Sequence, residues 1–352
     1  MRRTSVGLIG RVDRDGLLMD GQTVKTRTLY RLMVGRYGPD GVICADTRDY
    51  RRRPIRVALS LLLCVLRCKR IVVALSTHGR AMLFPVLYVC SRFFGTEVHH
   101  NLIGGWLASD VRSRPALVRY LNSFKVNYVE SHELCAELSQ QGVESVRYLP
   151  NFKMVSPVAC SELAWDPHEP VRLCLFSRIQ ERKGVTDAIL AVAILNNRAS
   201  TRFSLDLFGP IDPEYGEALS TLLNEHASYV TYKGVVEPDM SVQAIARYDG
   251  LVFPTRYREE GIPGTIIDGL SAGLPIVSAR WRYYDEVLED GATGISYPLG
   301  DVEALAGAIG SLFAGDHDLL SIKRECLNRA ALYSPASAFS QIAALLEDES
   351  LA

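Results

Sequence analysis

Short apolar runs rich in β-branched residues alternate with stretches of helical spacing along the whole chain. In the first half, six runs are expected to form strands, at residues 4–10, 41–46, 70–76, 96–105, 126–131 and 146–150. Six more runs follow in the second half, at residues 171–177, 203–209, 230–236, 250–255, 274–279 and 294–298. Strands that alternate with helices predict an α/β fold with parallel, doubly wound sheets.

A polar, proline-containing stretch separates the two series of strands. It follows Phe152 and includes Ser156-Pro157 and Glu169-Pro170. The 352 residues also exceed what one hydrophobic core usually organises. We therefore expect two Rossmann-like domains. Their predicted bounds are residues 1–152 and 153–335, and an amphipathic helix at about 336–352 can pack back on the first domain.

Composition and cysteine usage set broad limits on the class of protein. Hydrophobic residues make up 48% of the chain and charged residues 22%, which excludes wholesale disorder. The eight cysteines are scattered and form no Cys-x-x-Cys pair, so they fit reduced thiols. The N-terminal residues lack a signal-peptide cleavage pattern, and we therefore expect a cytoplasmic protein.

Charge divides unevenly between the halves. Residues 1–150 carry 23 Lys and Arg against 12 Asp and Glu, whereas the remainder carries 16 against 28. Residues 48–70 join basic clusters to an apolar run that is shorter than the roughly 20 residues needed to span a bilayer. Two interpretations are open: a helix lying on an anionic membrane surface, or a core helix flanked by solvated arginines. Nucleic-acid binding is not expected, because the basic excess lacks interleaved exposed aromatics.

Residues 256–279 carry the strongest chemical signal. A strand should end in a charged loop here, and a helix should begin at about Gly264. The amides of Gly264 and Thr265 then lie at an uncapped helix N-terminus, which favours a phosphate. Glu260 and Asp268 flank this point as hydrogen-bond acceptors for sugar and ribose hydroxyls. Taken alone, the segment also fits an ordinary βαβ connection.

A second segment, residues 175–189, places Arg178, Arg182 and Lys183 in a loop after a predicted strand. The planar guanidinium and the mobile ammonium can together neutralise a diphosphate leaving group without a metal. A solvated basic turn is the alternative. Both segments follow strand carboxyl ends, where open α/β sheets bind ligands.

The combined motifs resemble the retaining glycosyltransferases of family 4, which have the GT-B fold. The resemblance therefore implies that the two Rossmann-like domains face a central cleft. The resemblance covers nearly the whole chain and rests on the order of four elements: Arg178-x4-Lys183-Gly184, Gly234-x-Val236, Pro254-Thr255 after a strand, and Glu260-x7-Asp268 before a small-residue helix end.

The resemblance implies a role for each matched residue. Arg178 and Lys183 would bind the donor diphosphate and stabilise the leaving charge. Glu260 would contact the transferred sugar, and Asp268, which replaces the usual Glu, would contact the nucleotide ribose. Ser177 stands where many members have glycine. The remaining donor-binding positions are Gly234 and Val236 near the base, and Gly261, Gly264 and Thr265.

The N-terminal half contributes candidates through its loops. Gly21 and Gln22 occupy the place of the family's glycine-rich loop over the donor phosphates. A nicotinamide-dinucleotide site is weighed against this, but Gly7, Gly10 and Gly16 lack the required spacing.

Two adjacent histidines end the strand predicted at 96–105. Such a residue could hydrogen-bond the donor sugar or an acceptor hydroxyl, but neighbours on a strand point to opposite faces, so one of the two should be packing. We assign His100, nearer the strand end, to catalysis, and we assign His99, Gly104 and Gly105 to the acceptor side.

The sequence thus predicts a glycosyltransferase that moves a sugar, with retention, from a nucleoside diphosphate sugar to a hydroxyl. UDP-sugars are favoured as donors, and no cofactor or metal is expected. The expected acceptor is a lipid-linked intermediate of a capsule or exopolysaccharide. The expected location is cytoplasmic, with peripheral attachment to the inner face of the cell membrane as an open alternative. Two other functions stay open: a GT-B nucleotide-sugar epimerase, and a nucleotide-sugar-binding protein without turnover.

Overall fold

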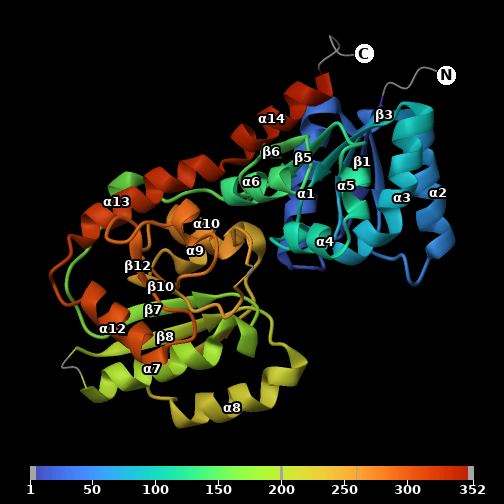
Figure 1. The fold of residues 1–352 in the computed structure, drawn as a ribbon. Coiled ribbons are helices and arrows are strands. Elements are labelled where there is room, and N and C mark those ends of the chain that lie inside the picture. The colour runs from blue at the N-terminus through green and yellow to red at the C-terminus, as the bar shows by residue number, and fades with distance from the viewer. Residues whose placement is uncertain (1–4, 199–200, 259, 348–352) are drawn as a thin grey trace. The chain divides into compact units, whose positions relative to one another are not determined.

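The computed structural model describes residues 5–198, 201–258 and 260–347, and they form two compact units (Figure 1). One unit comprises Met1–Lys153 with Tyr333–Ala352, and the other comprises Met154–Leu332. Each contains a six-stranded parallel sheet flanked by helices, and the strands fall on the apolar runs described above. The predicted α/β fold class is confirmed.

The sheet of the first unit has the order β2-β1-β3-β4-β5-β6. Its strands are β1 (Ser5–Gly10), β2 (Val42–Asp46), β3 (Cys68–Ala74), β4 (Glu97–Asn101), β5 (Val126–Val129) and β6 (Val146–Tyr148). Its helices are α1 (Gly21–Tyr37), α2 (Pro54–Arg67), α3 (Thr77–Phe94), α4 (Leu107–Ser113), α5 (Ala116–Leu121), α6 (His132–Gln140) and the last helix, α14 (Pro335–Glu347).

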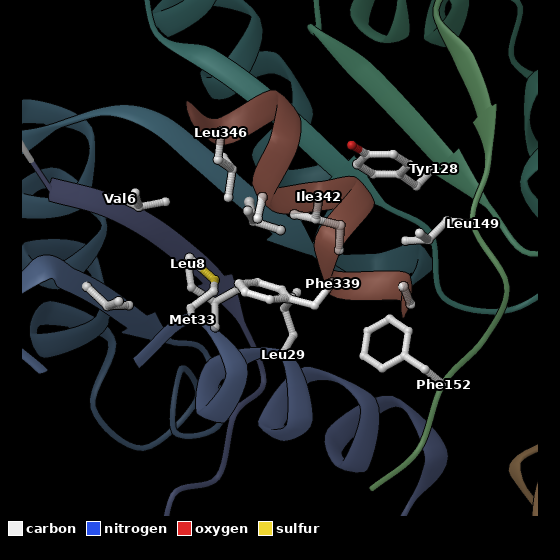
Figure 2. Close-up of a cluster of buried hydrophobic side chains, with 14 of the residues drawn as sticks. Val6, Leu8, Leu29, Met33, Tyr128, Leu149, Phe152, Phe339, Ile342 and Leu346 are labelled. Atoms are coloured by element: carbon white, nitrogen blue, oxygen red, sulfur yellow. The ribbon is translucent and has the colours of Figure 1, made fainter. Parts of the chain in front are cut away.

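The last helix completes the core of this first unit. Figure 2 shows Phe339 of α14 beside Leu29 and Met33 of α1, and Ile342 and Leu346 belong to the same buried cluster. The spacing of three to four residues turns these α14 side chains to one face, and each is buried. Burying an apolar side chain of this size contributes roughly 1.5–3 kcal/mol, so α14 is an integral part of the unit.

The sheet of the second unit has the order β12-β11-β10-β7-β8-β9, so β7 and β10 are central neighbours. Its strands are β7 (Val171–Phe176), β8 (Phe203–Phe208), β9 (Val230–Gly234), β10 (Gly250–Phe253), β11 (Ile276–Ala279) and β12 (Gly294–Tyr297). Its helices are α7 (Val185–Arg198), α8 (Gly216–Glu225), α9 (Ser241–Ile245), α10 (Gly264–Ser271), α11 (Tyr284–Val287), α12 (Val302–Leu312) and α13 (Leu319–Ala330).

Local signals located several element ends correctly. Helix α10 begins at Gly264, as predicted. Helix α1 ends before Gly38, whose N–H donates to the carbonyl of Val34. One strand was predicted too long: β4 ends at Asn101, and the chain turns at Gly104, which has a φ of 80°.

Across the described residues, no helix combines the length and apolar character that crossing a bilayer requires.

Candidate functional site

The loops that follow β7 and β10 press against each other at the carboxyl edge of the second sheet. Gly184, with a φ of 72°, ends a 3₁₀ turn at Glu181–Lys183. A Cβ atom on Gly184 would lie 1.8 Å from the carbonyl oxygen of Pro254, so only glycine fits. The N–H of Arg256 donates to the carbonyl of Arg182 at 3.0 Å, which joins the two loops.

This approach brings Lys183 and Glu260 together. Their Nζ and Oε2 atoms are 2.6 Å apart, and each side chain is 18% exposed. The Thr255 hydroxyl donates to the same Glu260 oxygen at 3.1 Å. The pair is accessible from solvent, so a ligand phosphate can compete with Glu260 for the ammonium. The sequence indicated the two charges separately, but neither their pairing nor the contribution of Thr255.

Further cationic groups gather in these loops. Arg178 is exposed at the end of β7. The Lys183 ammonium lies 5.2 Å from the centre of the Tyr257 ring, and the Arg182 guanidinium donates to the Tyr257 hydroxyl at 3.3 Å. Arg256 is bound by Asp187 and by Glu181. Tyr257 and Arg256 lie in a loop, so no helical or strand periodicity indicated in the sequence that they belong to this site.

Helix α10 presents its N-terminus at the same edge. Its N-cap is Pro263, which provides no side-chain cap, and the first turn contains no acidic residue. The Thr265 hydroxyl donates to the carbonyl of Phe176 at 2.6 Å and fixes the start of the helix on the end of β7. The positive end of the helix dipole is therefore available to an anion, as expected for Gly264 and Thr265.

Asp268 lies inside the packing of this helix. Its side chain is 1% exposed, and its Oδ1 accepts from the hydroxyl of Ser241, the first residue of α9, at 2.7 Å. The carboxylate thus links α9 to α10 in the described structure. A contact of Asp268 with a ribose stays a prediction, and this burial counts against it.

The remaining donor-side positions lie on neighbouring strand ends. Gly234 ends β9 with a φ of 85°, and its carbonyl accepts from the N–H of Gly209 at 2.9 Å. A Cβ atom on Gly209 would lie 1.8 Å from the carbonyl oxygen of Ser177, so the ends of β7, β8 and β9 are tightly apposed. Val236 and Gly261 are half-buried in the loops that follow β9 and β10.

The two histidines of β4 are both inside the first unit, with no exposed surface. His100 contacts the rings of Phe84 and Phe124, and its Nδ1 lies 3.1 Å from the Asn127 amide oxygen. Burial lowers the pKa of both imidazoles to about 3. We expected one of them to pack and one to face a substrate, but the burial of both favours packing roles.

The N-terminus of α1 differs from that of α10. Helix α1 begins at Gly21, and the carboxylate of the N-cap Asp20 accepts from the N–H and the hydroxyl of Thr23. Arg11 also pairs with Asp20. A phosphate placed over Gly21 and Gln22 would meet this carboxylate, so their assignment to donor binding has no electrostatic support in this unit.

A buried charge cluster lies beside that helix. Asp13, fully buried with a φ of 48°, pairs with Arg27 at 2.8 Å and also with Arg48. Burial raises the pKa of Asp13, but hydrogen bonds from Leu18 and Arg48 and the charge of Arg27 outweigh it and lower the pKa. Asp13 and Asp15 stand at Asp-x-Asp spacing, and both contact Arg48.

The whole chain is similar to solved GT-B glycosyltransferases. HepE from Anabaena, in complex with UDP and glucose, superposes with a TM-score of 0.72 at 15% identity, covering 97% of this chain and 99% of that one. Sucrose-phosphate synthase from Thermosynechococcus elongatus gives a TM-score of 0.74 at 16% identity, covering 97% and 98%. These likenesses confirm the GT-B fold.

The second unit contains a region that matches a family of known proteins. Residues 170–314 match the family of glycosyl transferases group 1, so this region is a group 1 glycosyltransferase domain. The match includes the loops of β7 and β10 and helix α10. At the level of this domain, the resemblance to a glycosyltransferase that the sequence indicated is confirmed.

Curated relatives carry names from glycan synthesis. The chain is 26% identical over 191 residues to the amylovoran biosynthesis glycosyltransferase AmsK of Erwinia amylovora. It is 27% identical over 194 residues to the putative colanic acid biosynthesis glycosyltransferase WcaL of Salmonella typhimurium. Each alignment includes 51% of this chain, and the chain spans just under half the length of these relatives, 45% and 46%.

Proposed function

We propose that this protein transfers a sugar from a nucleoside diphosphate sugar to a hydroxyl group during polysaccharide biosynthesis. The observation that carries the proposal is the solvent-accessible pair of Lys183 and Glu260, 2.6 Å apart at the carboxyl edge of β7 and β10. It lies in the group 1 glycosyltransferase domain, and α10 begins only four residues after Glu260. A sugar diphosphate needs a cation and a helix dipole for its phosphates and a hydrogen-bond acceptor for its sugar hydroxyls, and this site offers all three.

In the proposed reaction, the donor diphosphate takes Lys183 from Glu260 and also engages Arg178 and the N-terminus of α10. Glu260, still held by Thr255, becomes free to accept hydrogen bonds from sugar hydroxyls. The bond between the anomeric carbon and the diphosphate oxygen breaks while the acceptor oxygen attacks from the same face. A donor phosphate oxygen takes the acceptor proton, and the cations stabilise the departing diphosphate. The configuration at the anomeric carbon is thereby retained.

The finer parts of the proposal concern the substrates and location. Structures of HepE with UDP and with UDP-glucose favour a UDP-sugar as donor. The names of AmsK and WcaL support an acceptor in the assembly of an extracellular or capsular polysaccharide. We propose that this acceptor is lipid-linked and that the protein works at the cytoplasmic face of the cell membrane.

A thermal-shift panel of nucleoside diphosphates and their sugars tests donor binding. A selective ligand at a hundredfold excess over its Kd adds about 2.7 kcal/mol to apparent stability, and UDP compounds should give the largest shift. Lys183→Ala should lose most of that shift, keep its unfolding temperature without nucleotide, and reduce turnover at least tenfold. A panel without any shift would reject the proposal, and near-normal activity of Lys183→Ala would remove Lys183 from the mechanism.

A binding protein without turnover is the second candidate, favoured by the position of Asp268. The family acid at this position is shortened here and held by Ser241. Incubation of the shifting donor with the protein, with and without glycan acceptors, separates the candidates. Transfer of the sugar or hydrolysis of the donor excludes a binding protein without turnover, whereas an epimer formed without an acceptor identifies an isomerase.

A further inference from the structure

An unusual amount of apolar surface is exposed on two helices of the first unit. On α2, five side chains that recur every three to four residues are 42–76% exposed: Ile55, Leu59, Leu62, Leu63 and Leu66. On α3, four more at the same spacing are 45–76% exposed: Met82, Val86, Val89 and Phe93. Each helix therefore turns an apolar stripe outward, opposite to the usual arrangement in a surface helix.

The two stripes belong to one face of the sheet. Cys64 of α2 lies over Gly7 of β1, where an added Cβ atom would come within 2.5 Å of its sulfur. Phe84 of α3 packs on His100 of β4, with ring centres 5.1 Å apart. The strand register matches Gly7 and His100 to residues two apart on β3, so both contacts are on the same side.

Only two residues of α2, Val57 and Cys64, are buried. The helix thus rests on the sheet along a narrow line and leaves its stripe outward.

The charge of this region has a single sign. Residues 50–96 contain nine Lys and Arg and no Asp or Glu. Lys69 and Arg70 pair with Glu97, and Arg80 pairs with Asp110. The exposed arginines around the stripes have no ion pair recorded with any described residue: Arg52, Arg53, Arg56, Arg67 and Arg92.

The start of α2 adds a place for an anion. A surface hollow of about 480 Å³ there is lined by Arg52, Arg53, Pro54, Ile55, Arg56 and Leu59. The helix has no side-chain cap and no acidic residue in its first turn. Guanidinium groups, free helix amides and two apolar side chains thus converge, a combination that suits a phosphate attached to acyl chains.

We propose that the outward face of α2 and α3 docks on an anionic lipid bilayer, with the apolar stripes in the acyl boundary and the arginines at the phosphates. Neither helix is long and apolar enough to cross the bilayer, so the contact is interfacial. A second copy of the chain fits less well, because a two-fold contact would bring two acid-free basic surfaces together.

Docking here extends the proposed function, since a membrane contact serves a lipid-linked acceptor. It nevertheless rests on separate residues and can be tested without donor or acceptor.

Vesicle sedimentation of the full chain tests the proposal. Vesicles of phosphatidylcholine alone and of phosphatidylcholine mixed with phosphatidylglycerol are compared at low and high salt. Binding should require the anionic lipid and weaken with salt. Each arginine near such a surface contributes about fivefold in partition (~1 kcal/mol), so R52Q/R53Q/R56Q should bind about a hundredfold more weakly. L59S/L62S/L66S should also weaken vesicle binding, and this loss of binding should be the same at low and at high salt.

The controls separate lipid binding from folding and from nucleotide binding. Arg147→Gln and Leu332→Ser change exposed residues elsewhere and should bind vesicles like wild type. All variants should retain their unfolding temperature and the UDP-induced shift, which involves the second unit.

Equal partition of the wild-type protein into neutral and anionic vesicles would overturn the proposal, and so would wild-type binding by either triple variant. A third contrary result would be a wild-type protein that does not bind vesicles but forms concentration-dependent dimers, which L59S/L62S/L66S does not form. The last result would assign the face to a second copy.

Discussion

The two sheets carry charge differently at their carboxyl ends. In the second unit, Lys183 and Glu260 form a pair that is reachable from solvent, beside a helix with no acidic cap. In the first unit, Asp13 is buried between Arg27 and Arg48, and Asp20 already caps α1. A solvent-accessible pair can exchange one partner for a ligand, whereas breaking a buried pair costs about 3–5 kcal/mol. The arrangement in the second unit suits exchange with an anionic ligand, and that in the first unit suits a fixed loop structure.

The largest effect should come from the close contact behind the accessible pair. Gly184→Ala adds a side chain 1.8 Å from the Pro254 oxygen at a φ of 72°. We expect the free energy of unfolding of the second unit to fall by about 3 kcal/mol or more, with loss of UDP binding. Urea unfolding measures the first change and thermal shift the second.

Gly291→Ala is the matched control, because its φ is 80° but no atom lies within 4 Å of an added Cβ. Gly291→Ala should lower the free energy of unfolding only by the strain of a side chain at positive φ, about 1–2 kcal/mol. Equal costs for the two variants would show that the contact between the loops does not matter.

A smaller effect should come from the link between α9 and α10. Ser241→Ala removes a hydrogen bond to the buried Asp268 carboxylate and should lower the free energy of unfolding by about 2 kcal/mol. UDP affinity should change little if Asp268 serves packing. Ser340→Ala, at an exposed serine of α14, is the control. A tenfold loss of UDP affinity at unchanged stability would instead support the ribose assignment of Asp268.

The smallest effect concerns the buried histidines of the first unit. Their folded pKa of about 3 lies below the ordinary value near 6.5, so protons bind preferentially to the unfolded chain as pH falls. The stability that the neutral histidines contribute is present above pH 6.5 and is lost as the pH falls toward 3. At pH 5.5 each histidine should cost on the order of 1 kcal/mol.

His99→Leu isolates one of these contributions, since neither ring nitrogen of His99 has a hydrogen-bond partner among the described residues. Urea unfolding at pH 7.5 and 5.5 should show a smaller loss on acidification than in wild type. His78→Leu changes an exposed histidine and serves as control. An unchanged loss in His99→Leu would contradict the burial-based explanation.

Local patterns predicted the strands and the start of α10, because strand periodicity and glycine signals are properties of neighbouring residues. The pairing of Lys183 with Glu260 depends on a tertiary contact at Gly184 between segments far apart in the chain. Strand alternation showed that His99 and His100 face opposite ways. It could not show that both faces are covered. Asp268 is likewise buried because of α9, which its own motif does not include.

The docking of α14 has a consequence for synthesis of the protein. The strands of the first sheet are translated early. Phe339, Ile342 and Leu346 of its core are translated only after the second unit, which ends at Leu332. The nascent first unit must therefore leave the side chains that pack on α14, such as Leu29 and Met33, uncovered while Met154–Leu332 is made. We expect the second unit to close before the first, so the order of folding is the reverse of the order of translation.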